Sequence, residues 1–203
     1  MPYSKDHKAS VRSKIVEAAR QLFNRYGFDN VSIDQLMAEA GLTRGGFYAH
    51  FRSKEEVFAA ATASFLSGRG AQWRSEAGVD PSAGQREMAK RMVASYLSRE
   101  HLEAVDAQCP LIAYATDVAR SGPQVRESYR DLLQAMVGLY EANLGETDKA
   151  ARRRALSLAA LTIGGMVVAR ALPGEPIANE IREAALADAN ALWLDCEPAH
   201  AIA

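Results

Sequence analysis

The stretch GLTRGGFYAHFRSK, residues 41–54, contains the residues that decide how this chain folds. Gly45 and Gly46 stand side by side where the surrounding pattern indicates helix, and each costs about 1 kcal/mol relative to alanine in a helix interior. Phe47 and Phe51 follow, four positions apart, so that both lie on one face of a helix and can anchor it to a core. The segment therefore combines a weakened helix with firm anchoring, and the residues around it supply the reason.

Two helical patterns precede this segment. In residues 10–28, SVRSKIVEAARQLFNRYGF, apolar residues recur at helical spacing, and Gly27 is placed to end the helix. In residues 31–41, VSIDQLMAEAG, Ser32 and Gln35 can form a capping box at the start of a second helix. Short helices joined by a three- or four-residue turn with glycine are typical of a helix-turn-helix, whose second helix enters the DNA major groove.

DNA binding gives the two glycines a purpose, because missing side chains let the backbone of the inserted helix approach the duplex closely. Arg44, at the tip, can pair with guanine O6 and N7, which is worth about 1–3 kcal/mol of discrimination. Thr43 is expected to cap this helix, and Lys54 to hold a phosphate in the first turn of the next one. The residues predicted to contact DNA are Ser32, Thr43, Arg44, Gly45, Gly46, Tyr48, His50 and Lys54.

Charge is unevenly distributed along the 203 residues. The net charge is −1, but residues 1–54 hold nine lysines and arginines against five acidic residues, whereas residues 55–203 hold fifteen against twenty. A basic N-terminal part on an acidic body suggests that only the first part meets a polyanion. Chance variation in composition produces such a split as well, so charge alone leaves both interpretations open.

Composition argues against several other classes of protein. Apolar residues make up 48% of the chain, enough for a sizeable core. The longest apolar stretch, residues 156–172, follows three arginines and contains Arg170, which favours a packed helix over a membrane span. The N-terminus lacks the apolar core of a secretory signal. Cys109 and Cys196 are in no metal-type pair, so we expect no disulfide, no metal and a cytoplasmic location.

The rest of the chain also reads as helices, which predicts an all-α fold. Ser53 and Glu56 form a second predicted capping box, opening a long helix that runs through residue 73. Residues 75–85 read as a loop because they hold glycine, proline and serine without periodicity. Further helices are expected at 84–100, 110–120, 123–144, 148–172 and 177–195. We place a helix-turn-helix domain at 1–54 and a larger helical domain for ligand binding and dimerisation at 55–203, with a connecting helix from about 54.

The motif GLTRGGFYAHFRSKEEVF, residues 41–58, closely resembles the signature of the TetR family of bacterial transcriptional regulators, and residues 11–58 follow that family's N-terminal domain throughout. Beyond residue 58 the resemblance is limited to helical character and suitable length. The resemblance implies a C-terminal region that binds a small-molecule inducer and forms a homodimer, and it implies a repressor. Where the family usually has a small polar residue after the tip, this chain has Gly46, so one side-chain contact to bases is expected to be missing.

Residues in the middle of the chain are candidates for an inducer pocket, because they are large, apolar or carry a single polar group. These are Trp73, Met88, Met92, Tyr96, Cys109, Tyr114, Met136 and Tyr140. Plain core packing is the alternative for each. Pro110 is suited to the first position of a helix, which would place Cys109 at the N-cap, where the helix dipole favours a reactive thiolate. Cys109 is therefore either a sensor of oxidants or electrophiles or a small buried residue.

The last two predicted helices carry the expected homodimer surface. The helix at 148–172 is apolar around most of its circumference. Packing against a single neighbouring element would require only one apolar face. Two such helices from each chain would build a two-fold, four-helix interface and present two recognition helices to a palindromic operator in double-stranded DNA. The residues predicted for this interface are Leu161, Gly164, Gly165, Val168, Ile181, Ala185, Leu192 and Trp193.

Two other function classes remain open at this stage. An all-helical enzyme is disfavoured because the sequence has no metal-ligand spacing, no phosphate-binding glycine loop and no evident nucleophile–base pair. We therefore expect no cofactor and no catalytic residue. An activator, or a DNA-binding protein without an inducer, is compatible with the sequence, since the direction of regulation depends on where the operator lies. The inducer, the operator and the regulated genes are not encoded in any motif of this chain.

Overall fold

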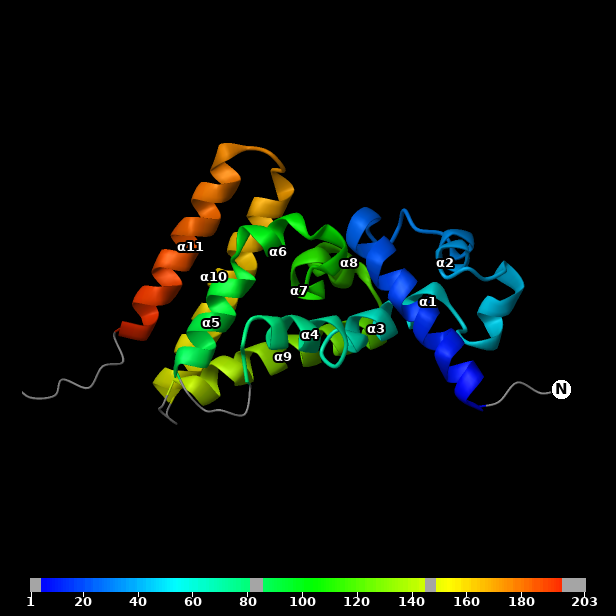
Figure 1. Ribbon diagram of the computed structural model, residues 1–203, viewed down its shortest axis with the longest axis horizontal. Coiled ribbons are helices and arrows are strands. Elements are labelled where there is room, and N and C mark those ends of the chain that lie inside the picture. Colours follow the sequence, from blue (N-terminus) through cyan, green and yellow to red (C-terminus); the bar gives the residue numbers. More distant parts are fainter. Residues whose placement is uncertain (1–4, 81–85, 145–148, 195–203) are drawn as a thin grey trace, which may run out of the picture. The chain divides into compact units, whose positions relative to one another are not determined.

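The computed structural model describes residues 5–80, 86–144 and 149–194, with the side chains of Arg86, Trp193 and Leu194 excepted (Figure 1). This described part is all-helical, as predicted, and contains no strand. Its α-helices are α1 (Lys5–Tyr26), α2 (Ile33–Glu39), α3 (Lys54–Ser64), α4 (Arg69–Glu76), α5 (Arg86–Tyr96), α6 (Arg99–Glu103), α7 (Pro110–Ala113), α8 (Ala115–Arg120), α9 (Pro123–Asn143), α10 (Lys149–Ala171) and α11 (Pro176–Leu194). Two 3₁₀ helices, η1 (Arg44–Ala49) and η2 (Val105–Ala107), complete the list.

The chain folds into two compact units that do not follow sequence order. The first unit holds residues 1–70 and 105–132, and the second holds residues 71–104 and 133–203. The helix-turn-helix segment is therefore built together with η2, α7, α8 and the first part of α9. These units describe which residues pack together, and they do not test the functional boundary proposed at residue 54, which stays a prediction.

The core of the first unit is one apolar cluster around α1. Ile15, Ala19 and Phe23 are fully buried in α1 and meet side chains of α2, η1, α3 and α8. Phe58 of α3 and Tyr114 lie with their ring centroids 4.8 Å apart within it. The apolar stripe read from the sequence of α1 is thus the buried face, and it holds the short helices of the DNA-binding segment in place.

The helix predicted from residue 54 to 73 is interrupted. It ends at Ser64, and α4 begins at Arg69. The amide of Gly70 donates to the carbonyl of Phe65 at 2.8 Å, and a Cβ on Gly70 would lie only 2.6 Å from that oxygen. The close turn thus requires glycine at position 70, and the helical periodicity on both sides concealed it.

Smaller corrections apply to three other predicted helices. The stretch predicted at 84–100 ends at Tyr96, and a separate α6 follows after the N-cap Ser98. The stretch at 110–120 is two short helices, α7 and α8, that meet at Tyr114. The loop predicted at 75–85 begins at residue 77, two residues later than expected, and its residues 81–85 lie outside the described part.

The second unit is built on a pair of long helices, α10 and α11, which pack along each other. Helix α5 lies against α11 and α6 against α10. A buried arginine connects two of these elements, since Arg182 of α11 donates to the carbonyl of Leu97, just past the end of α5, at 2.7 Å. Helices α10 and α11 are joined by a short turn at Gly174, whose φ of +83° suits glycine.

Candidate DNA-binding site

The element predicted as the recognition helix is η1, a six-residue 3₁₀ helix rather than an α-helix. Phe47 and Phe51 are buried (0% and 1% exposed) in the core of the first unit, and their ring centroids are 5.9 Å apart. The predicted anchoring from behind is therefore confirmed. A 3₁₀ helix has poorer hydrogen-bond geometry than an α-helix and is used in short pieces, so these rings must hold η1 in place.

The two glycines of η1 play different parts. A Cβ on Gly45 would meet nothing within 4 Å, so this glycine faces open space, as close approach to DNA requires. A Cβ on Gly46 would lie 3.5 Å from Cε of Met37 in α2. Position 46 is therefore close to α2 as well as partly exposed, and the predicted contact of Gly46 with DNA stays a prediction.

The capping predictions hold for α2 and in part elsewhere. Ser32 accepts from the amide of Gln35 at 3.2 Å, and the Gln35 carboxamide accepts from the amide of Ser32 at 2.8 Å, so the capping box is complete. Ser53 accepts from the amide of Glu56, but the Glu56 carboxylate accepts from the amide of Arg52 instead of Ser53. Thr43 occupies the N-cap of η1 without a side-chain cap bond.

The outward side of η1 carries a guanidinium and a phenol. Tyr48 is 63% exposed, and its ring stands edge-on to the ring of Phe47 at 5.3 Å. Arg44 is exposed and donates to Asp34 of α2 at 2.7 Å. An ion pair between exposed groups contributes little to stability, so Arg44 can exchange Asp34 for a base edge at small cost.

Lys54 does not have the position expected of a phosphate contact. Its Nζ donates to the carbonyls of Phe28 and Val31 at 2.8 and 3.0 Å and lies 4.1 Å from the centre of the Phe28 ring. The ammonium thus caps the loop between α1 and α2 from the first turn of α3. The sequence placed a lysine at the start of a helix. It did not show that the loop carrying Phe28 and Val31, more than twenty positions earlier, would accept hydrogen bonds from that lysine.

His50, the C-cap residue of η1, is half-buried and lies in a basic environment. Burial lowers the pKa of its imidazole below the ordinary value, and the positive charges of Lys8 and Arg12 on α1 lower it further. The neutral form of the imidazole is therefore favoured, and a neutral imidazole can still donate one hydrogen bond to a phosphate.

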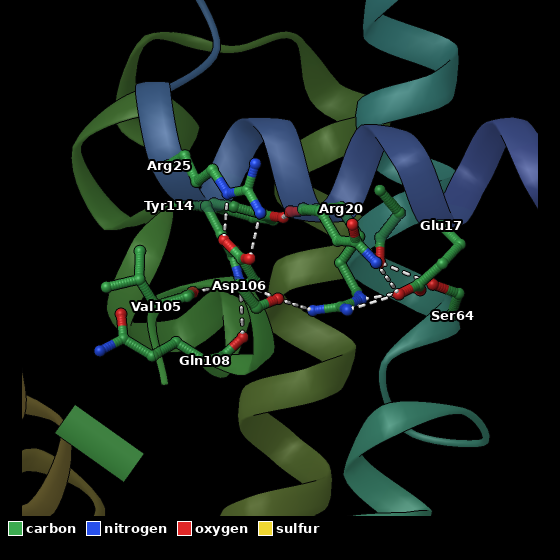
Figure 2. A network of polar contacts seen from close by, with 11 residues as sticks. Glu17, Arg20, Arg25, Ser64, Val105, Asp106, Gln108 and Tyr114 are labelled. Carbon is green, nitrogen blue, oxygen red and sulfur yellow. Dashed lines mark hydrogen bonds and ion pairs between the residues drawn. The ribbon is translucent and has the colours of Figure 1, made fainter. Parts of the chain in front are cut away.

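The opposite side of α1 carries a polar clamp onto residues 105–108 (Figure 2). Asn24 is fully buried, and its Nδ2 donates to the carbonyls of Val105, Asp106 and Gln108 at 3.0–3.2 Å. Arg20, 3% exposed, donates to the Asp106 carbonyl and to the Glu17 carboxylate. Because buried carbonyls need donors, these two side chains make an irregular segment compatible with the core.

Further contacts extend this clamp. The hydroxyl of Tyr114 donates to the carbonyl of Arg20 at 3.0 Å. The hydrogen bond from Arg20 holds the pKa of the Glu17 carboxyl below its usual range, and the bond from Arg25 does the same for Asp106. Sequence reasoning missed the clamp. The available signal was the placement of Arg20 and Asn24, one turn apart, inside the apolar stripe of α1.

The predicted inducer residues are divided between the two units. Cys109 and Tyr114 belong to the first unit, where Tyr114 is fully buried in the same core as the helix-turn-helix. The others belong to the second unit: Trp73, Met88, Met92, Tyr96, Met136 and Tyr140. Of these, Trp73 and Tyr96 meet with ring centroids 5.9 Å apart, and both contact the ring of His101. Tyr114 is thus a core residue of the DNA-binding unit, and the pocket assignment of the others stays a prediction.

Cys109 is the N-cap residue of α7, with Pro110 directly after it, as predicted. It is 3% exposed and follows the clamped residues 105–108 without a gap. Tyr129 of α9 interacts electrostatically with Cys109. Burial raises the pKa of the Tyr129 hydroxyl to about 12, and the nearby Cys109 adds to that increase. The Tyr129 hydroxyl donates to the carbonyl of Leu111 at 2.9 Å.

The predicted interface residues differ in how much surface they offer. Gly164 and Val168 of α10 are exposed, and Leu161, Ile181 and Leu192 are half-buried. A Cβ on Gly165 would lie 2.7 Å from Cβ of Ala185, so these two buried residues bring α10 and α11 together within one chain. They provide no surface for a partner. The side chain of Trp193 lies outside the described residues.

Helix α10 is long and apolar enough to cross a membrane by length and composition, the one such helix in the described part of the chain. A core helix passes the same test. Leu158, Thr162 and Met166 are fully buried along one side of α10, which fits the packed helix predicted from the sequence.

The succession of α1, α2 and the short η1, anchored by buried aromatic rings and exposed at its tip, is the layout of a helix-turn-helix. Residues 15–61 match the family model described as bacterial regulatory proteins, tetR family. The N-terminal region of this chain is thus similar to the corresponding region of TetR-family transcriptional regulators.

Curated relatives are most similar in the same N-terminal region. The transcriptional repressor Rv1474c of Mycobacterium tuberculosis is 39% identical over 55 residues, 27% of this chain and 29% of the relative. The uncharacterised regulator YfiR of Bacillus subtilis is 40% identical over 55 residues, 27% of each chain. The match thus spans little more than a quarter of these relatives. The regulator AcrR of Shigella flexneri is 24% identical over 161 residues, 75% of each chain.

Solved structures share the fold over nearly the whole chain. The reduced form of NemR from E. coli has a TM-score of 0.72 at 19% identity, covering 90% of this chain and 96% of that one. A TetR-family regulator from Streptomyces coelicolor has a TM-score of 0.69 at 20% identity, with 94% and 97% covered. At such identities the likeness supports the fold alone.

Proposed function

We propose that this protein is a cytoplasmic repressor that binds a palindromic DNA operator as a homodimer and leaves it when a small molecule binds or a thiol is modified. The observation that carries the proposal is η1, whose Arg44 and Tyr48 are exposed while Phe47 and Phe51 fix it from behind. The description of the relative Rv1474c as a repressor supports the direction of regulation.

A homodimer would use the exposed apolar side chains of the last two helices. Leu156, Val168 and Leu172 of α10 and the turn after it, and Ile177 of α11, are 39–49% exposed. Apolar side chains gathered on neighbouring elements favour burial against a second copy. Two copies would present two η1 elements, and the operator would then be a (pseudo)palindrome with half-sites about one helical turn apart.

Release from DNA would begin at residues 105–109. Arg20 and Asn24 bind the carbonyls of residues 105, 106 and 108, so a change in that backbone has to move α1 or break these bonds. Because α1 packs against α2, η1 and α3, such a movement changes the presentation of η1. Binding of a ligand near this segment or modification of Cys109 would start the movement. Each would shift the protein toward the conformation in which the ligand or the modified thiol is better accommodated.

DNA binding is tested by selecting duplexes from random oligonucleotides with the full-length protein. We expect enrichment of a palindromic sequence, bound with strong salt dependence. Arg44→Ala should bind the selected sequence less selectively than the wild type. A protein with no salt-sensitive preference for any duplex would contradict the proposal. Light scattering at low micromolar concentration should give twice the 22.0 kDa of one chain.

The thiol branch has a separate test. We expect iodoacetamide at neutral pH to modify Cys109 in the native protein and to weaken operator binding, while Cys109→Ser keeps operator binding and loses the response. A native Cys109 that ignores iodoacetamide would remove the thiol branch. A panel of small molecules, scored by the rise in melting temperature and by loss of operator binding, tests the ligand branch.

A further inference from the structure

A group of basic side chains lies beside η1 on the first two turns of α1, outside the residues assigned to DNA so far. Lys8 is exposed and Arg12 is 43% exposed at its side chain, and the two are one helical turn apart. Both act electrostatically on His50 at the end of η1, as does His7. The positive side chains of Lys8 and Arg12 on α1 thus lie close enough to His50 at the end of η1 to form one surface with it.

Arg12 is held in this surface by an aromatic ring. Its guanidinium carbon lies 4.2 Å from the centre of the Phe51 ring, the same ring that anchors η1. A guanidinium on an aromatic face keeps its outer N–H groups available to an anion. The position of Arg12 relative to η1 is therefore fixed by a direct contact.

The carboxylate that pairs with Arg12 neutralises the positive charge of its guanidinium only in part. Glu56 of α3 approaches Arg12 at 3.8 Å through Oε1, which is a long contact for an ion pair. Its other oxygen, Oε2, accepts from the amide of Arg52 at 2.7 Å. Glu56 is thus held by the backbone and only partly offsets the charge of Arg12.

We propose that Lys8 and Arg12 of α1, together with His50, form a second phosphate-binding surface that grips the DNA backbone beside the groove occupied by η1. The partner is duplex DNA, recognised through phosphate charge and not through base edges. This inference rests on the proposed function, since it extends the same DNA interface. It assigns the register of the protein on the duplex to α1, and base selection stays with η1.

The surface also predicts a pH effect with a definite sign. His50 faces Lys8, Arg12 and His7 from α1, Glu56 lies on the adjoining α3, and Arg52 is close in sequence. Burial and the charges of Lys8 and Arg12 keep the pKa of His50 low in the unbound protein, whereas a bound phosphate would raise it. Proton uptake then accompanies binding, so affinity should increase as the pH falls from 8 to 6, and His50→Gln should remove part of that increase.

The test compares two double variants of the full-length protein. Lys8→Gln with Arg12→Gln removes the proposed surface, and Lys149→Gln with Arg153→Gln removes an exposed pair of the same residue types and spacing on α10. Binding to a random-sequence duplex is measured by fluorescence anisotropy between 50 and 200 mM salt. We expect the slope of log K against log salt to lose about 1.8 for each bound chain in the α1 variant, from two phosphate contacts, and to stay unchanged in the α10 variant.

Two further variants separate charge from packing. Lys8→Gln alone, at an exposed position that supports no packing, should lose about half of that slope change. Arg12→Lys keeps the charge and should retain the slope even if the stacking on Phe51 is weakened. A wild-type slope in the α1 double variant would overturn the inference while leaving the proposed function intact. A wild-type protein that binds no duplex at all would instead remove the proposed function.

Discussion

Two arginines in the first unit show opposite uses of the same side chain. Arg20, on α1, is 3% exposed and donates hydrogen bonds to the carbonyl of Asp106 and the carboxylate of Glu17. Arg44, on η1, is exposed and has the carboxylate of Asp34 as its ion-pair partner. The first arginine holds the η2 segment against α1, and the second is available to a ligand.

The difference lies in what each substitution would leave behind. Removing Arg20 or its neighbour Asn24 leaves buried carbonyls short of donors, which costs stability. Removing Arg44 leaves only an exposed carboxylate that water solvates. Stability and recognition are thus located on opposite sides of the same small unit, and the following experiments test that separation in order of expected effect.

Asn24→Ala should have the largest effect, lowering the free energy of unfolding by about 2–4 kcal/mol because the carbonyls of Val105 and Gln108 lose a buried donor. Asn30→Ala is the matched control, since Asn30 donates to the carbonyl of Tyr26 from an exposed position and should cost about 0.5 kcal/mol or less. Urea denaturation of both variants measures the two values. Equal losses would show that the clamp is no more important than a surface bond.

Lys54→Met should come next, because it tests whether this lysine caps a loop or binds DNA. Loss of two carbonyl contacts should reduce the unfolding free energy by about 1–2 kcal/mol, and the salt slope of DNA binding should stay at the wild-type value. Thermal denaturation and salt titration give both readouts. A slope smaller by about 0.9 with unchanged stability would restore the phosphate contact expected from the sequence.

Arg44→Ala should leave stability within about 0.5 kcal/mol of the wild type and reduce discrimination for the selected operator by about 1–3 kcal/mol. Arg99→Ala is its control, because Arg99 forms an exposed ion pair with Glu103 at 2.6 Å in the second unit. Competition binding between the operator and a scrambled duplex measures discrimination. If Arg44→Ala discriminates as well as Arg99→Ala, the base reader lies elsewhere.

Asp106 should give the smallest effect, through pH. The hydrogen bond from Arg25 lowers the pKa of the Asp106 carboxyl in the folded protein, so the pair stabilises the fold above pH about 4 and loses that contribution as the pH falls below it. The side chains of Arg25 and Asp106 are 39% and 42% exposed, so solvent screening keeps the contribution small. Asp106→Asn should flatten the loss of stability between pH 7 and 3. An unchanged acid profile would remove Asp106 from the pH response.

Much of the DNA-binding segment could be predicted from local sequence. The Ser32–Gln35 capping box, the stop at Gly27 and the burial of Phe47 and Phe51 depend on residues within a few positions of one another. Such short-range patterns report the helix period directly. For the same reason the all-helical class and the bounds of α9, α10 and α11 were predicted to within a few residues.

The contacts that the sequence did not reveal join residues that lie far apart in the chain. Lys54 looked like a phosphate contact until the loop at residues 28–31 occupied its ammonium. Tyr114 looked like a pocket residue, but its hydroxyl is bound to the carbonyl of Arg20, 94 positions away. Gly165 looked like an interface residue, but α11 packs closely against it in the same chain.

The sequence by itself determined the class of the protein, the helices and the exposed tip of η1, because periodicity, caps and glycines act over short distances. Only the tertiary structure decided which polar side chains are used up inside the fold. The identity of a lysine or arginine does not reveal whether it binds a phosphate or a backbone carbonyl. Its partner depends on which distant segment the fold brings within about 3 Å of its donors.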